Sequence, residues 1–411
     1  MANLQPIDPR QRIEILDVLR GFALFGILFN NILYFSGYTL QPFAELRLNS
    51  TYHLDELLYG LLDVVITAKF YTLFSILFAV GFYLQLSRHK DDASGFLRTY
   101  RRRLSILLLI GVLHSLFWYG DILLLYALIG FVLISVRNMS KEGLARLAVL
   151  FVVLPSIIDV AILPFSEADA TAQDALAHTT YPDMAPAVVM DVFRTGTITE
   201  IFSLNLHNLI WKWLSYVPSG RIATVLGIFV LGFYLGRINF FQDQVRSTKL
   251  LVLGLVLGLS ATVLSMVMGG NPYQFPSTPA NALYKALLVV GQLFLCLFYV
   301  VSISRLFHTP WGKKALSYLR PVGRMALTNY ISQSLICVFI FYNFGLNLIG
   351  ALGLVYVVCI ALGVLAFQLV VSNLWLRYFL YGPLEWVWRT LTYRKRIAIR
   401  ARGSAPATIP S

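Results

Sequence analysis

Long apolar runs alternate along this chain with short polar segments rich in Lys and Arg. Ten runs are long enough to cross a bilayer as helices, because about 20 apolar residues span its hydrocarbon core. The predicted spans are residues 15–35, 60–84, 104–119, 121–137, 144–164, 220–238, 250–269, 282–305, 324–346 and 351–380. The third and fourth spans are separated only by a turn at 118–121, which predicts a tight helical hairpin. The pattern therefore predicts an all-α, polytopic membrane helix bundle with about ten transmembrane helices.

The positive charges of the polar segments predict the orientation of the bundle. Lys and Arg gather in the N-terminal segment, in loops 85–103, 138–143, 239–249 and 306–323, and in the C-terminal tail. With ten spans, all of these segments fall on one side, and Lys- and Arg-rich loops mark the cytoplasmic side. We therefore expect both termini in the cytoplasm.

The opposite side receives one long segment, 165–219, which is acidic. We expect short helices around Trp211 and Trp213, because tryptophan rings suit the membrane interface. The segment is a candidate lid or acceptor-binding element, with a passive loop as the alternative.

These segments divide the chain into four parts. We expect an N-terminal membrane region of five spans (1–165), an extracytoplasmic segment (166–219), a C-terminal membrane domain (220–390) and a cytoplasmic tail (391–411) that is partly disordered.

Composition supports the membrane assignment. The chain is 58% hydrophobic and 13% charged, whereas soluble proteins carry about 25% charged residues. The basic loops account for the net charge of +13, so nothing here indicates a nucleic-acid partner. Cys296, Cys337 and Cys359 all lie in apolar runs, which predicts neither a disulfide nor a cysteine-based metal site. We expect no metal cofactor.

The first span carries a polar seam. Asp17, Arg20, Leu24, Ile27 and Asn31 fall on one helical stripe, along which Arg20 and Asn31 lie about 16 Å apart. Polar groups inside a bilayer usually face a protein interior or a wet cavity. The seam therefore needs partners from other spans, and Arg20, near the cytoplasmic end, suits a phosphate group.

His114 and Asp121 are the best candidates for proton transfer. The pKa of histidine lies near working pH, as a general base requires, and a carboxylate seven residues on can hold the imidazole in one tautomer. In the alternative, His114 bonds a neighbouring backbone and Asp121 is a helix N-cap. The two roles of Asp121 are compatible.

Lys69 lies within the second span, where an ammonium group is costly. In a continuous helix Lys69 and Asp63 point to different sides, so we expect them not to be partners. Lys69 would pair with Asp17 or Asp121, or it would join Asn31 in stabilising a reaction oxyanion.

The ninth span opens with a polar group of residues. Asn329 and Gln333 are neighbours one helical turn apart, with Ser332 beside them, and such side chains can bond membrane helices together. Arg324 either extends to the cytoplasmic face or binds a phosphate entering from it. Asn329 is a further candidate for the same cofactor site.

Five segments and one histidine resemble a known family. Residues 16–21, 69–75, 118–123, 323–330 and 382–389, together with His114, look like the signatures of YeiB-like bacterial inner-membrane proteins, whose C-terminal half is called domain of unknown function 418. The Asp-x-x-Arg-Gly opening is distantly similar to heparan-glucosaminide acetyltransferase and to the large group of membrane acyltransferases. The resemblance implies a multi-pass protein of the bacterial inner membrane. It also implies transfer of an acyl group from cytoplasmic acyl-CoA to a sugar on the far side.

The leading hypothesis is thus a transmembrane acyltransferase. Acyl-CoA would bind near Asp17, Arg20, Arg324 and Asn329, and His114 with Asp121 would activate a glycan or lipid-linked acceptor. The alternative is a transporter of a small or lipid-linked solute, with Asp63, Lys69 and Asp121 along its path. A weaker alternative is a membrane sensor or scaffold.

Overall fold

The computed structural model describes residues 13–89, 92–166, 185–243, 245–270, 272–273, 276 and 278–400. Over these residues the chain forms helices and no strand, with one isolated backbone bridge between Phe379 and Arg400. The all-α prediction is therefore confirmed, as expected for a backbone that must satisfy its own hydrogen bonds in lipid. In chain order the elements are α1 (Glu14–Phe35), the 3-10 helix η2 (Tyr38–Leu40), α2 (Phe43–Leu46), α3 (Tyr52–Val65), α4 (Lys69–Arg88), α5 (Ala93–Phe117), α6 (Leu123–Ser135), α7 (Lys141–Ser166), α9 (Pro186–Thr195), α10 (Ile198–Ser215), α11 (Arg221–Arg237), α12 (Phe240–Asp243), α13 (Thr248–Met268), α14 (Pro279–Phe307), α15 (Pro310–Ser317), α16 (Leu319–Arg324), α17 (Ala326–Phe341), α18 (Leu354–Tyr378) and α19 (Pro383–Tyr393).

Each predicted span coincides with one helix or with a pair of helices. Within the described chain, six helical segments are long and apolar enough to cross a membrane: Glu14–Phe35, Tyr52–Arg88, Lys141–Pro164, Thr248–Met268, Pro279–Phe307 and Leu354–Tyr378. Helices α6 and α17 are apolar but shorter. The protein is thus a helical membrane protein, while the count of ten spans and the orientation stay predictions.

The predicted second span is interrupted. Helix α3 ends and α4 begins at Lys69, after Ala68 with a φ of 67°. The break follows four β-branched residues, 64–67, which have weaker helix propensity. The Lys69 ammonium turns back and donates to the Asp63 carbonyl oxygen at 2.9 Å, where the end of α3 leaves carbonyl groups open. The expectation assumed one continuous helix, and the break lets Lys69 reach the Asp63 backbone. Within the described residues no ion pair joins Lys69 to the Asp63 carboxylate, so the two side chains are not ion-pair partners.

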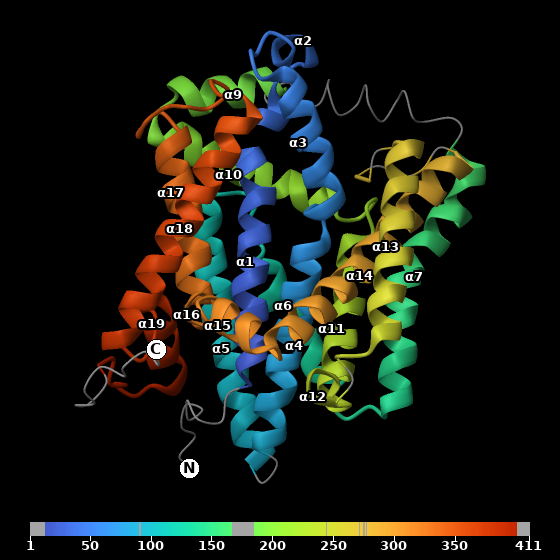
Figure 1. The fold of residues 1–411 in the computed structure, drawn as a ribbon, viewed down its shortest axis with the longest axis vertical. Helices are drawn as coiled ribbons and strands as arrows, with labels where there is room; N and C mark the ends of the chain where they lie inside the picture. The colour runs from blue at the N-terminus through green and yellow to red at the C-terminus, as the bar shows by residue number, and fades with distance from the viewer. Residues whose placement is uncertain are drawn as a thin grey trace.

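Helix α1 lies in the middle of the bundle, with α17 and α18 on one side and α4 on the other (Figure 1). Glycines set its closest contact: a Cβ at Gly21 would overlap the backbone of α16, and a Cβ at Gly323 would overlap the carbonyl of Asp17. The two helices touch backbone to backbone, as small residues allow in membrane bundles. This contact brings Arg20 and Arg324 to one end of the bundle, where α1 begins and α4 ends, which we call the arginine-rich end.

Helices α7, α11, α13 and α14 form a second group beside this core (Figure 1). Gly254 and Gly258 let α13 pack closely against α14. A buried ion pair joins α14 to α7, because the Lys285 ammonium lies 2.7 Å from a carboxylate oxygen of Asp159 and donates to the Pro218 carbonyl oxygen at 2.7 Å. Many large apolar side chains of α7 and α13 are exposed, which suits contact with lipid.

The segment between α7 and α11 covers the opposite end of the bundle. Its described part forms α9 and α10 (Figure 1), while residues 167–184 lie outside the described residues. Trp211 and Trp213 lie on α10, so the helix expected around them is confirmed. The Asn205 amide donates to the Leu116 carbonyl oxygen at 2.9 Å and joins α10 to the end of α5.

The start of the predicted tail is ordered against α19. The Leu380 amide donates to the Ile399 carbonyl oxygen at 2.8 Å, and the Trp386 indole donates to the Ile397 carbonyl oxygen at 2.7 Å. The prediction of partial disorder concerns the stretch from Ser404 onward, which lies outside the described residues.

Gly323→Ala is expected to destabilise the protein, because the added methyl group would overlap the Asp17 carbonyl oxygen and separate α16 from α1. Overpacking of this kind costs about 1–3 kcal/mol. Gly363→Ala is the matched control, since a Cβ at that position of α18 meets no atom within 4 Å. Thermal unfolding in detergent should show a lower midpoint for Gly323→Ala only. Equal midpoints for the two variants would contradict the close contact.

Candidate functional site

A pocket of about 210 Å³ opens at the arginine-rich end, between α1, α4, α5, α16 and α19. Five arginines line it: Arg20, Arg88, Arg103, Arg324 and Arg389. The acidic residues of its wall are Asp17 and Glu385, so the cations are in excess. Such a wall favours an anionic ligand, and the planar guanidinium group matches phosphate geometry.

The close contact of α1 and α16 places the two predicted arginines in this pocket. Arg20 forms an ion pair with Asp17 one turn away, with a nitrogen–oxygen distance of 2.8 Å. Arg324 donates to the Leu380 carbonyl oxygen at 3.2 Å. Three of the four predicted cofactor-binding residues therefore lie in one pocket wall.

Helix α19 packs against the start of α17 and forms part of the pocket wall. The Glu385 carboxylate accepts bonds from the Leu327 amide at 2.7 Å, the Thr328 amide at 3.1 Å and the Thr328 hydroxyl at 2.6 Å. It thus caps the start of α17, although burial raises the pKa of this carboxyl group. The Trp388 ring lies 4.0 Å from the Arg103 guanidinium, and its indole nitrogen donates to the Arg103 carbonyl oxygen at 2.9 Å.

The inner end of the pocket is apolar and aromatic. Leu107, Leu123, Tyr126 and Tyr330 line it. The Tyr330 ring also lies against the imidazole of His114, with 5.2 Å between the ring centroids. One aromatic ring therefore separates the pocket from the predicted general base.

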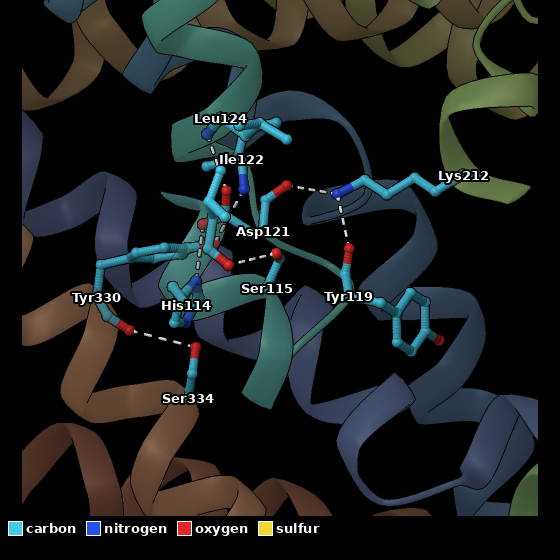
Figure 2. A network of polar contacts seen from close by, with 10 residues as sticks. His114, Ser115, Tyr119, Asp121, Ile122, Leu124, Lys212, Tyr330 and Ser334 are labelled. Atoms are coloured by element: carbon cyan, nitrogen blue, oxygen red, sulfur yellow. Dashed lines mark hydrogen bonds and ion pairs between the residues drawn. The ribbon is translucent and has the colours of Figure 1, made fainter. Parts of the chain in front are cut away.

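His114 and Asp121 form a buried pair behind that ring (Figure 2). His114 Nδ1 lies 2.7 Å from Asp121 Oδ2, and their side chains are 2% and 0% exposed. A carboxylate only accepts, so Nδ1 carries the proton of this bond and Nε2 of the neutral ring carries the lone pair. Nε2 is buried and has no hydrogen-bond partner within the described part of the chain. Asp121 Oδ1 also accepts from the Leu124 amide at 2.8 Å, so its two expected roles coexist.

Lys212 of α10 fixes the turn between α5 and α6 (Figure 2). Its ammonium group donates to the carbonyl oxygens of Tyr119 and Asp121. Burial lowers the pKa of Lys212 to about 7, although the Asp121 carboxylate partly opposes this shift. The segment predicted as a lid or acceptor-binding element thus contacts the backbone of Asp121.

Three predicted site residues lie elsewhere. The Asn329 amide donates to the Val322 carbonyl oxygen and the Ser372 hydroxyl, both at 3.0 Å, and so bonds α17 to its neighbours. Asn31 accepts from the Asn30 amide at 3.4 Å. Across the described residues, neither Asn31 nor Lys69 has a recorded bond with His114 or Asp121, and no ion pair joins Lys69 to Asp17. The oxyanion role stays a prediction.

Sequence reasoning missed Tyr330, Glu385, Trp388 and Lys212. The first three occur within segments that resemble a known family. The local sequence, however, does not indicate which of these distant segments are in contact. Lys212 stands between Trp211 and Trp213, and a lysine flanked by interface tryptophans is the one signal that could have marked it.

Comparisons with known proteins place the chain in a family. Residues 235–395 match the family described as "Protein of unknown function (DUF418)". "Uncharacterized protein YxaH" of Bacillus subtilis (strain 168) is 32% identical over 96% of this chain and 97% of its own length. "Uncharacterized protein YeiB" of Escherichia coli (strain K12) is 29% identical over 93% of this chain and 97% of its own length. No solved structure matches the chain. By this similarity along nearly its whole length, the chain belongs to the YeiB-like DUF418 family.

Proposed function

We propose that this protein is a transmembrane acyltransferase of the bacterial inner membrane. It would cross the membrane ten times with both termini in the cytoplasm, so that the arginine-rich end faces the cytoplasm. The donor is acyl-CoA, and the acceptor is a sugar or a lipid-linked group on the other side. The distant resemblance of the Asp-x-x-Arg-Gly opening to membrane acyltransferases favours this class.

The observation that carries the proposal is the position of the pocket relative to His114. The pocket has a cationic wall at the arginine-rich end and an aromatic inner end at Tyr330, whose other face contacts His114. The phosphate groups of acyl-CoA would bind Arg20 and Arg324, and the pantetheine arm would extend inward toward Tyr330. Because the Tyr330 ring stands between the pocket and His114, the thioester reaches Nε2 only when this ring moves aside.

The reaction needs one proton acceptor and one proton donor, and His114 can be both in turn. Nε2 removes the proton from the acceptor hydroxyl or amine, whose oxygen or nitrogen forms a bond to the acyl carbon. The bond from carbon to sulfur breaks, and the imidazolium returns the proton to the leaving thiolate of CoA. The Asp121 carboxylate stabilises the imidazolium and holds its orientation.

Arg20→Gln and Arg324→Gln should each weaken the binding of acetyl-CoA about tenfold, because each removes a charge-assisted contact to phosphate. The measurement is calorimetric titration of the purified protein. Arg305→Gln is the control, because Arg305 is an exposed arginine that bonds the Thr248 hydroxyl at 2.7 Å and lies outside the pocket wall. The same affinity in all three variants, or no binding to the natural protein, would argue against this donor site.

His114→Gln should bind acetyl-CoA normally but lower the rate of transfer by about 10²–10⁴, the usual contribution of a general base. Asp121→Asn should also lower the rate by up to about 10⁴, because an amide no longer enforces the tautomer. The assay measures CoA release by proteoliposomes supplied with acetyl-CoA and a bacterial glycan or lipid extract.

Two outcomes would contradict this assignment. Full transfer activity in His114→Gln would remove that residue from the reaction while leaving the class intact. Flux of solute into proteoliposomes without any CoA release would support the transporter instead.

A further inference from the structure

A second cationic site lies at the start of α11. Arg221 is the first residue of α11, and its guanidinium group lies 4.3 Å from the Tyr71 ring centroid and 5.6 Å from that of Tyr216. Gly220, with a φ of 61°, packs against Pro155 and fixes the start of the helix. The position of Arg221 is therefore set by the backbone.

Arg221 has no carboxylate partner in the described part of the chain. No ion pair joins it to a carboxylate there, its side-chain hydrogen bond with Tyr216 is to a neutral phenol, and its Nε is buried without a partner. The Tyr71 hydroxyl is already bonded to Gln292 at 2.8 Å. An arginine inside a membrane bundle is costly unless a counter-charge balances it, so an arginine without a carboxylate partner marks a functional-site hypothesis.

The surroundings of Arg221 favour an anion. Lys212 lies on the same Tyr216 ring, 5.9 Å from its centroid, so two cations flank one tyrosine. The Asp121 carboxylate, whose charge acts on Lys212, is bonded to His114 and to the Leu124 amide. The cluster therefore has positive charge without a carboxylate bonded to Arg221.

Tyrosine side chains lie around Arg221 and Lys212, and the two cations and several of these rings are partly exposed. Tyr34, Tyr71 and Tyr119 are only partly buried, as are Arg221 and Lys212. Tyrosine faces suit the stacking of a sugar ring. The guanidinium lies over the Tyr71 ring, and a planar guanidinium binds an oxyanion through its N–H groups.

We propose that Arg221, with Lys212 beside it, binds the phosphate group of a phosphate-bearing acceptor. The inference deepens the proposed function, on which it rests, by naming the acceptor class. Lys212 connects the two sites, since it also bonds the carbonyl oxygen of Asp121. An acceptor held at Arg221 and Lys212 would therefore approach the turn that carries Asp121 from the side of α10.

The test is calorimetric titration of the full chain in phosphatidylcholine nanodiscs with glucose 1-phosphate, glucose and inorganic phosphate, without acyl-CoA. We expect glucose 1-phosphate to bind about tenfold or more tightly than glucose, and Arg221→Gln to lose about tenfold of that affinity. Arg194→Gln is the matched control, because Arg194 lies on α9 at the same end and bonds the Ile349 carbonyl oxygen at 3.2 Å. It should bind like the natural protein.

Two further arms sharpen the result. Arg221→Lys keeps the charge but not the planar guanidinium, so we expect an intermediate affinity for glucose 1-phosphate. If Arg221→Gln does not purify as a single species, the two single variants Arg221→Lys and Lys212→Gln take its place. If the natural phosphate-bearing acceptor is a lipid, phosphatidylglycerol in the nanodisc should compete and weaken the binding of glucose 1-phosphate. If the natural acceptor is soluble, phosphatidylglycerol should leave that binding unchanged. Either result supports the phosphate site and identifies the source.

Equal binding of glucose and glucose 1-phosphate, or no loss in any Arg221 variant, would overturn the inference. Because the titration contains no acyl-CoA, this failure is distinct from failure of the proposed function. A protein that binds glucose 1-phosphate through Arg221 but neither binds nor cleaves acetyl-CoA would keep the phosphate site and lose the transferase assignment.

Discussion

A charge between membrane helices is stable only when a second helix supplies its partner, and this requirement organises the bundle. Lys285 of α14 is paired with Asp159 of α7. Lys69 is satisfied by a carbonyl group that the break between α3 and α4 exposes. Glu385 of α19 accepts the free amides at the start of α17. The contacts of Lys285 and Glu385 join elements that are distant in sequence, and the contact of Lys69 joins two consecutive helices. Polar contacts therefore help to fix which helix ends lie together.

Several buried polar atoms in the described structure have no hydrogen-bond partner, and two of them belong to the residues on which the proposals rest. These two atoms are His114 Nε2 and Arg221 Nε. Burying an unpaired polar atom costs free energy that the protein does not recover by folding. In the proposed function a bound acceptor would supply the missing partner of each atom. His114 would offer a lone pair and Arg221 a cation to that acceptor.

The two ends of the site differ in character for a physical reason. At the arginine-rich end the guanidinium groups line an open pocket, where water screens their mutual repulsion. The His114–Asp121 pair lies behind Tyr330 with almost no exposed surface, where an electrostatic contact is much stronger than in water. A donor anion would thus be recognised in a wet region, and proton transfer would occur in a dry one.

The sequence by itself determined the positions of the helices and the class of protein, because hydropathy and span length are properties of local segments. It also identified the stripe of Asp17 and Arg20 on α1. It identified the His114–Asp121 pair as well, because the two residues are only seven positions apart across a short turn. Only the tertiary structure decided where α3 and α4 separate, because weak helix propensity becomes a break only when Lys69 can satisfy the freed carbonyl. Likewise, only packing placed Tyr330 against His114, Glu385 under α17 and Lys212 on the Asp121 carbonyl group. These contacts join helices far apart in the chain, and a linear pattern carries no information about which polar face meets which.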